Sequence, residues 1–244
     1  MIRFYDIPCK HYGVSWSPNT LKIVYTLNYM NLPYEVIWIE LPDIEETLKS
    51  IGVSPTATKP DGLPKYTLPA IHDLDTGVRL SESIDIVEYL EATYPNVSGK
   101  ALVPRGTKSL QLAFVDAIIL LLTPTLGLVL LQEEKILNAR SREYLVKTLI
   151  GKEVSEIAPP PEEREAAWKS LENAWAKVDS WIQKEDSFVM GNTACFVDFV
   201  LAGFFVWYKV MWGEDSEEWK RISSWQGGRW ARLVHDLAEF ERLK

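Results

Sequence analysis

Four short runs of apolar residues in the first part of the chain have the pattern of β-strands. These are residues 2–7, 34–39, 68–73 and 78–80. Three other segments space apolar side chains three or four positions apart, as amphipathic helices do: residues 19–30, 43–51 and 83–93. Residues 54–65 are rich in Pro, Thr, Lys and Gly, which favours a loop. The order of these elements predicts a small α/β domain.

The second part of the chain shows only helical periodicity. Six helices are expected there, at residues 107–137, 139–157, 162–184, 196–211, 215–225 and 229–240. Residues 112–131 carry one charge, at Asp116, and are long enough to span a membrane. Because Pro124 interrupts this run between two threonines, we interpret it as a buried, proline-kinked helix of a soluble protein.

Composition narrows the possible classes of function. The chain has 244 residues, 47% of them hydrophobic, with a formal net charge of −8 and a pI of about 5.1. Such an acidic chain disfavours nucleic acid or an anionic membrane surface as the main partner. Arg3, Asp6 and Lys10 break any apolar leader at the start of the sequence, so we expect a cytoplasmic protein.

Cysteine and histidine usage adds two further expectations. The two cysteines, Cys9 and Cys195, are far apart and fit thiols of a reducing compartment better than a disulfide framework. The three histidines have no paired spacing, so no metal site is predicted. The ten tryptophans indicate either an aromatic core or a pocket for flat apolar ligands.

The start of the first predicted helix, Ser17-Pro18, carries the main candidate chemistry. A serine hydroxyl accepts from a free backbone N–H at a helix start, and proline at the first helical position loses no hydrogen bond. The same place favours an anion, because backbone dipoles point toward it. Ser17 is therefore either a helix cap or a group that holds a thiolate. Cys9 lies eight residues earlier, too far from this helix start for a thioredoxin-type catalytic cysteine.

The order of four motifs resembles that of the cytosolic glutathione transferases. They are the helix start Ser17-Pro18, the strand Leu68-Pro69-Ala70-Ile71, the turn Ser81-Glu82-Ser83 and the helix start that contains Asp198. The resemblance implies a thioredoxin-like α/β domain at residues 1–95, a linker at 96–106 and an all-helical domain at 107–244. It also implies a cis bond before Pro69.

Further segments are similar to one branch of that family. They are the run from Trp16 to Lys22, Leu32-Pro33-Tyr34, Trp38 in the second strand, the Pro42-Asp43-Ile44-Glu45 turn and the insertion Thr58-Lys59-Pro60-Asp61-Gly62. They resemble the branch related to bacterial lignin β-etherases, which includes the fungal class FuA. In one respect the chain departs from the family. Cys195 stands where the capping motif has Ser or Thr. A thiol is a weak acceptor, so we expect that cap to come from elsewhere, such as Thr193.

The resemblance implies glutathione as cosubstrate, with no metal, and assigns roles to particular residues. Ser17 would stabilise the thiolate, and five residues would bind the rest of glutathione: Trp38, Leu68, Pro69, Glu82 and Ser83. The pocket for the electrophile would be lined by Tyr12, Ser15, Trp16, Phe114, Ile118 and Thr123. Without the resemblance, Ser81-Glu82-Ser83 would be a helix cap and most pocket residues would be core.

We therefore expect a dimeric glutathione transferase of the Ser type. Its reactions would be glutathione conjugation, peroxide reduction or attack on aromatic ethers and thioethers. The alternative is a ligandin that binds aromatic, polyphenol-like molecules with little turnover. Residues 1–95 would hold glutathione, and the helical domain would form much of the second pocket.

Overall fold

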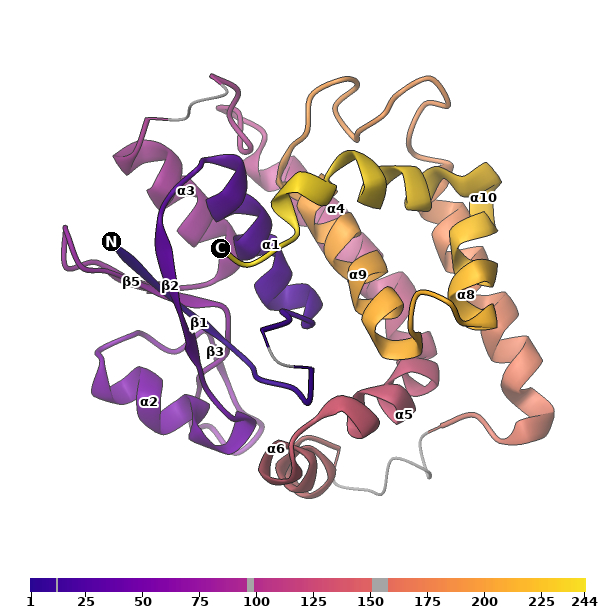
Figure 1. Ribbon diagram of the computed structural model, residues 1–244, viewed down its shortest axis with the longest axis horizontal. Coiled ribbons are helices and arrows are strands. Elements are labelled where there is room, and N and C mark those ends of the chain that lie inside the picture. Colours follow the sequence, from indigo (N-terminus) through magenta and orange to yellow (C-terminus); the bar gives the residue numbers. More distant parts are fainter. Residues whose placement is uncertain (12, 96–98, 151–157) are drawn as a thin grey trace.

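The chain consists of a sheet layer and a larger helical region that lie side by side (Figure 1). This computed structural model describes residues 1–11, 13–95, 99–150 and 158–244. The linker predicted at 96–106 and the helix predicted at 139–157 therefore fall partly outside the described residues.

The first part of the chain forms a four-stranded mixed sheet. Its strands are β1 (Ile2–Asp6), β2 (Tyr34–Trp38), β5 (Ala70–Asp73) and β6 (Arg79–Ser81). They lie in the order β2-β1-β5-β6, in which β2 is parallel to β1 while β5 is antiparallel to both β1 and β6. The helices of this part are α1 (Pro18–Tyr29), α2 (Ile44–Ser50), which follows a 3-10 turn, and α3 (Ser83–Thr93). The predicted α/β order is confirmed.

The loop predicted at residues 54–65 was wrong in part. It contains a separate two-stranded sheet made of β3 (Ala57–Thr58) and β4 (Pro64–Lys65). Lys59 N donates to Leu63 O, and Gly62 closes the turn with a φ of 84°. All four strand residues are exposed, so apolar alternation gave no signal for this hairpin.

The second part of the chain forms helices, apart from loops and two isolated β-bridges at residues 188–193, within its described residues. Its elements are α4 (Lys108–Leu122), η2 (Thr123–Thr125), α5 (Leu126–Ile136), α6 (Ala139–Tyr144), the π-helix η3 (Leu145–Ile150), η4 (Pro161–Glu163), α8 (Arg164–Asp179), α9 (Phe196–Trp212), α10 (Glu217–Asp236) and η5 (Ala238–Phe240). The backbone of α10 leaves helical geometry at residues 225–228, which confirms that two helical segments meet there.

The long apolar run at 112–131 is kinked as predicted but is not buried. The 3-10 turn at Thr123–Thr125 separates α4 from α5 around Pro124. Residues Lys108–Leu130 have the length and composition of a membrane-spanning helix. Only 28% of the most apolar stretch within them is buried in the protein. One side of α4 packs on α8 and α9. The other side exposes Leu110 and Leu120, which are 72% and 76% accessible.

Helix α9 is the centre of the molecule and packs across α1 (Figure 1). Gly203 permits this approach, because a Cβ at Gly203 would lie 3.1 Å from the carbonyl oxygen of Pro18. Further along, the ring of Phe199 stacks on that of Tyr25 with centroids 5.4 Å apart. The first turn of α1 is thereby fixed against the helical part.

Most tryptophans belong to the aromatic core between α8, α9 and α10. Trp175 lies among Phe205, Tyr208 and Trp230, with ring centroids 4.4–6.2 Å apart. Trp175 is completely buried, and Trp230 is 1% exposed. Of the two explanations for the tryptophan content, the aromatic core accounts for these residues.

The expectation for the start of α9 was also wrong. Cys195 is itself the N-cap residue, and it forms a reciprocal capping box with Asp198. Asp198 Oδ2 accepts from Cys195 N at 2.8 Å, and its Oδ1 accepts from Val189 N at 2.8 Å. The buried carboxylate thus supplies the stronger acceptor of the pair, so Thr193 is not needed as a cap.

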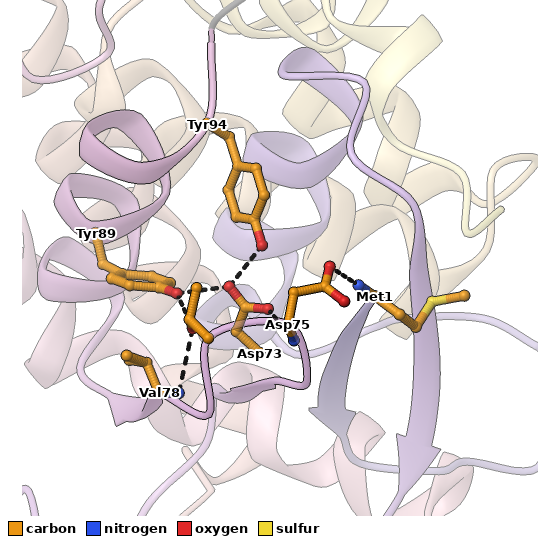
Figure 2. A network of polar contacts seen from close by, with 7 residues as sticks. Met1, Asp73, Asp75, Val78, Tyr89 and Tyr94 are labelled. Carbon is orange, nitrogen blue, oxygen red and sulfur yellow. Dashed lines mark hydrogen bonds and ion pairs between the residues drawn. The ribbon is translucent and has the colours of Figure 1, made fainter.

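A buried carboxylate ties the hairpin of β5 and β6 to α3 (Figure 2). Asp73 Oδ2 accepts from the hydroxyls of Tyr89 and Tyr94 at 2.5 and 2.6 Å, and Oδ1 accepts from Asp75 N at 3.0 Å. Burial raises the pKa of Asp73, but these hydrogen bonds outweigh it and leave the pKa below its usual value. The carboxylate therefore stabilises the fold at neutral pH, and this stabilisation is lost as the pH falls through that lowered pKa.

Removing the Tyr94 hydroxyl tests this network. Tyr94→Phe should lower the free energy of unfolding near pH 7 by on the order of 1–3 kcal/mol, because a hydrogen bond to a charged group is lost. The deficit should shrink as the pH falls below the ordinary range of aspartate. Urea unfolding of the variant and the wild type, near pH 7 and again below the ordinary pKa of aspartate, measures this deficit in the free energy of unfolding. Tyr66→Phe is the control, since Tyr66 contacts Lys49 through its ring face. A deficit that is equal at both pH values would contradict the charged form of Asp73.

Candidate functional site

One edge of the sheet gathers the residues that the sequence singled out. Asp6 at the end of β1 lies opposite Trp38 at the end of β2. Ala70, directly after Pro69, lies opposite both Tyr5 in β1 and Ser81 in β6. The ends of β1, β2 and β6 and the start of β5 therefore meet at the edge from which the loops to α1 and α3 depart.

Ser17 lies at the N-terminus of α1 as the N-cap residue. Its extended backbone (φ −70°, ψ 129°) precedes Pro18 at the first helical position, and its Oγ accepts from Asn19 N at 3.3 Å. The cap interpretation of Ser17 is thus confirmed. Because Oγ acts as an acceptor in this bond, its own hydrogen can be donated to another group. The side chain is 6% exposed.

The other two motifs of the edge have unusual backbone geometry. The Leu68-Pro69 peptide bond is cis, as the resemblance predicted. Glu82, the residue before α3, has a φ of 74° and a ψ of 112° although it carries a side chain. Non-glycine residues adopt such a conformation rarely, and it clusters at functional sites. Glu82 is exposed and Ser83 is half-buried at the first turn of α3.

A cation faces the start of α3 from α1. Lys22 Nζ donates to Asn19 Oδ1 at 3.2 Å. Burial lowers the pKa of Lys22 to about 8, although the charge of Glu82 acts in the opposite direction. Glu82 and Lys22 therefore place charges of opposite sign at the junction of α1 and α3.

A buried carboxyl group lies under the first turn of α1. Asp6 is fully buried, its Oδ1 accepts from Ile7 N at 2.7 Å, and its Oδ2 has no hydrogen-bond partner among the described residues. Burial raises the pKa of Asp6 to about 6, while the neighbouring hydroxyls of Ser15 and Thr20 act to lower it. These two hydroxyl oxygens are 3.5 Å apart, and Thr20 Oγ1 donates to Ser17 O at 3.3 Å.

The predicted pocket residues occupy different environments. Ser15 and Trp16 are buried, and the Trp16 indole donates to Ile7 O at 3.0 Å, so its side chain belongs to the core. Ile118 is also fully buried. Phe114 packs edge-on against Trp181, with centroids 5.2 Å apart. The hydroxyl of the exposed Thr123 donates to Ile119 O at 2.7 Å, and Tyr12 lies outside the described residues.

Trp38, which the resemblance assigns to glutathione binding, and the inserted Lys59 lie near β2 and α2. Trp38 is half-buried at the end of β2. Lys59, in the insertion, pairs with Glu45 at 2.6 Å, and Lys49 pairs with the other oxygen of the same carboxylate at 2.6 Å. Hydrogen bonds from both lysines hold the pKa of Glu45 at about 2.

Polar contacts between the region around the 3-10 turn η1 (Leu41–Asp43) and the start of α6 join the two parts of the chain. The Glu40 carboxylate accepts from Asn138 Nδ2 at 2.7 Å and from the hydroxyl of Ser141. Ser141 Oγ in turn accepts from Leu41 N at 2.8 Å. Arg140 binds Asp43 with two hydrogen bonds of 2.8 Å. These side chains hold the end of β2 against the helical part.

Family models match both parts of the chain. Residues 16–93 match the glutathione S-transferase N-terminal domain, and residues 109–240 match the glutathione S-transferase C-terminal domain. A glutathione S-transferase-like protein of Aspergillus flavus, ustS, is 32% identical over 96% of this chain and 88% of its own length. The chain belongs to the glutathione S-transferase family.

Solved structures of fungal transferases are similar over the whole chain. The glutathione transferase GSTFuA3 of Phanerochaete chrysosporium is 38% identical, with a TM-score of 0.91, and covers 100% of this chain and 98% of its own. The glutathione S-transferase CsGST63524 of Ceriporiopsis subvermispora, solved with glutathione, is 35% identical, with a TM-score of 0.93 and the same coverage. The resemblance to class FuA is confirmed, and glutathione is the cosubstrate of this family.

Three features of this transferase were missed at the level of sequence. Asp6 carried one signal, since it is a charged residue at the end of an otherwise apolar strand. Lys22 gave no sequence signal of its own, apart from ending the similar run from Trp16 to Lys22. Glu40 and its partners on α6 are about a hundred residues apart in sequence, so no local pattern could relate them.

The Cys9 thiol of this transferase is poorly suited to catalysis. It is 9% exposed, and its Sγ donates to His11 O at 3.4 Å. Burial raises the pKa of Cys9, and the Asp6 carboxylate raises it further. Both effects disfavour the thiolate that a nucleophile requires.

Replacing Cys9 separates the two candidate activating residues. Cys9→Ser should keep glutathione-dependent activity within about twofold, because a buried thiol that remains protonated contributes little to reactivity. Initial rates with a chromogenic electrophile near pH 7 provide the measurement, and Cys195→Ser is the matched control for loss of a buried thiol. A hundredfold loss in Cys9→Ser alone would assign the chemistry to Cys9.

Proposed function

We propose that the protein is a Ser-type glutathione transferase in which the Ser17 hydroxyl donates a hydrogen bond to the glutathione thiolate. The observation that supports this most strongly is the position of Ser17, which caps α1 through its oxygen and keeps its hydrogen for donation. The N-terminus of α1 adds backbone dipoles that favour an anion at the same place.

Stabilisation of the thiolate is what the reaction requires. The free thiol of a cysteine residue has a pKa of about 8.5 and is mostly protonated near neutral pH. A hydroxyl donor and a helix N-terminus that each lower this pKa by about one would make the thiolate the main form. In conjugation the sulfur then forms a bond to an electrophilic carbon, whose leaving group departs with the bonding electrons.

The remaining site residues fit the two ends and the middle of glutathione. Glu82 would pair with the γ-glutamyl amine, while Ser83 and the N-terminus of α3 would bind the γ-glutamyl carboxylate. The backbone of Leu68, before the cis bond to Pro69, would pair with the cysteinyl backbone. Trp38, at the end of β2, is the candidate for the glycine carboxylate. These roles require that the segments meet at one sheet edge, and the register that brings together the ends of β1, β2 and β6 and the start of β5 supports this.

The electrophile would bind beside α4 and the loop that follows β1. Among the described residues proposed for this pocket, Phe114 is half-buried and Thr123 is exposed. Conjugation, peroxide reduction and attack on aromatic ethers or thioethers all use the same thiolate. Because most tryptophans lie in the core, the tryptophan content gives no support to the ligandin alternative.

Replacing Ser17 tests the proposed chemistry. Ser17→Ala should reduce kcat/KM near pH 6.5 by about tenfold or more, because a pKa change of one corresponds to a tenfold change in ionisation. Initial rates between about pH 5.5 and pH 9 should also show that the loss shrinks at high pH, where glutathione ionises unaided.

A control is needed because Ser17→Ala also removes a helix cap, at a cost of about 1 kcal/mol. Ser216→Ala removes the equivalent cap from α10, where Ser216 Oγ accepts from Trp219 N at 3.0 Å. It should lower stability similarly and leave the pH profile unchanged. An unchanged profile in Ser17→Ala would refute the role of Ser17, and thermal shifts with hydroxylated aromatics but not glutathione would favour the ligandin.

We also propose that a second copy of the chain covers the exposed face of α4. This face presents Leu110 and Leu120, which are 72% and 76% exposed, on a helix with few charged residues. Such an apolar surface on a globular protein marks an interaction site. A homodimer would bury it without requiring another partner.

The oligomeric state provides the test. The double variant Leu110→Glu/Leu120→Glu should behave as a monomer of half the mass in light scattering, because two carboxylates would be desolvated in each half of the interface. Trp181→Glu, an exposed apolar residue of the same part of the chain, is the control and should remain dimeric. A monomeric wild-type protein at micromolar concentration would contradict the proposal.

A further inference from the structure

Asp6 is a buried titratable group that the proposed chemistry does not use. It lies at the end of β1, beside Thr20 in the first turn of the helix that Ser17 caps. Isolated charges are rarely buried, because transfer out of water is costly unless hydrogen bonds or counter-charges compensate. Oδ1 of Asp6 accepts from the backbone N–H of Ile7, and the nearby hydroxyls of Ser15 and Thr20 also favour the charged form, but burial outweighs all three. The other oxygen, Oδ2, is buried without a partner among the described residues.

The groups around Asp6 connect it to the backbone of Ser17. Ser15 and Thr20 bring their hydroxyls to the carboxyl group, and these hydroxyl oxygens lie 3.5 Å apart. Thr20 Oγ1 donates to Ser17 O at 3.3 Å, so Thr20 contacts both the carboxyl group and the N-cap residue. Ser17 O also accepts from the backbone N–H of Leu21 at 2.9 Å, which closes the first turn of the helix.

Charged and titratable groups near Asp6 do not neutralise it. The nearby titratable groups are the buried Cys9 thiol, in the loop after β1, and the hydroxyl of Tyr34, in β2. The charge of Asp6 raises the pKa of both groups. Helix α1 contributes the neutral Thr20 on this side, while its Lys22 is directed to Asn19 and Glu82. An ionised Asp6 is therefore a single negative charge under the site of an anion.

We propose that Asp6 is a positioning residue that makes the thiolate-stabilising effect of the α1 N-terminus depend on pH. When its carboxyl group is protonated, the dipole of α1 and the Ser17 hydroxyl act on the thiolate without opposition. When it is ionised, its charge repels the thiolate through a poorly solvated region and raises the pKa of bound glutathione. The inference rests on the proposed function, because it concerns the same thiolate.

Two coupled titrations follow from this arrangement. Asp6 ionises in the range in which the bound thiol also loses its proton, because burial raises its pKa to about 6. When two groups repel one another, their protons leave in a broader transition than that of a single group. The wild-type thiol should therefore titrate over a wider pH range than one proton requires, and a variant without the Asp6 charge should not.

The direct measurement is the ultraviolet absorbance of bound glutathione thiolate as a function of pH. Asp6→Asn keeps the shape of the side chain and removes the charge, so the thiol should ionise as a single group with a pKa lower by about one. Thr20→Val removes a hydroxyl that lowers the pKa of Asp6. The part of the absorbance titration that reflects ionisation of Asp6 should therefore move to higher pH. Thr26→Val is the control, since Thr26 is buried in the same helix and its hydroxyl donates to Lys22 O at 2.7 Å.

A second readout needs no glutathione. Because the pKa of Asp6 is higher in the folded protein than in the unfolded chain, ionisation of Asp6 opposes folding, and this cost appears as the pH rises through about 6. The unfolding midpoint of Asp6→Asn should therefore rise relative to that of the wild type when the pH is raised from about 4.5 to about 7.5. A difference in unfolding midpoint that is the same at both pH values would overturn the titration of Asp6.

The outcomes separate the inference from the function on which it rests. If Ser17→Ala loses the thiolate signal while Asp6→Asn titrates like wild type, the role of Asp6 is refuted and the Ser17 function stands. If wild-type protein binds glutathione without lowering its thiol pKa, both fail. Three results together would establish the proposal. The titration of the bound thiol should be narrower and have a lower midpoint in Asp6→Asn, its broad part should lie at higher pH in Thr20→Val, and it should be unchanged in Thr26→Val.

Discussion

The packing of the first turn of α1 against the end of β1 and against α9 is the constraint on which the site depends. On the sheet side lies Asp6, at the end of β1, and its carboxyl group is beside the hydroxyls of Ser15 in the loop after β1 and of Thr20 in α1. From the helical part, α9 approaches so closely that a Cβ at residue 203 would lie 3.1 Å from the carbonyl oxygen of Pro18. From the chain itself, Pro18 fixes the entry to the helix. A helix start held in this way cannot fray, so its N–H groups keep one direction.

The same constraint explains why the polar groups of the site can act on an anion. Ser17 is almost completely buried, and a hydrogen bond or a dipole is stronger where water is excluded. Because little water reaches this site, nearby charges also interact strongly with an anion bound there. Asp6 beneath the helix and the pair of Glu82 and Lys22 beside it are therefore part of the electrostatics of the site.

The contacts between the two parts of the chain place the second wall of the site. Glu40 and Asp43, which follow β2, bind side chains of α6, and Lys10 N donates to Ile136 O at 2.8 Å across the same junction. At the other end of α1, Asn28 Nδ2 donates to Phe240 O and Arg242 O, both at 2.8 Å, so the C-terminal segment returns to the α/β part (Figure 1). The sheet and the helices thus form one packed body around α1.

Local sequence patterns predicted most of the elements, because strand and helix periodicity depend on neighbouring residues. They were correct for α1, α3 and α9, and for the break around Pro124. They failed where the decisive contact is distant or the residues are exposed. The β3–β4 hairpin has no buried face, and the apolar face of α4 cannot be distinguished from core by composition.

The site was predicted from the order of its motifs, but its electrostatics were not. Ser17 and the cis bond before Pro69 could be anticipated because short motifs carry them. The environment of Asp6 depends on residues of two other segments, and the cap at Cys195 depends on the geometry of Asp198. Such features appear only when the chain is folded, because burial and direction decide what a polar group does.

A crystal structure of the protein with bound glutathione tests the central claim most directly. We expect the sulfur to lie within hydrogen-bonding distance of Ser17 Oγ at the N-terminus of α1, with the γ-glutamyl end at Glu82 and Ser83. A sulfur that lies instead beside Cys9, or away from the first turn of α1, would contradict it.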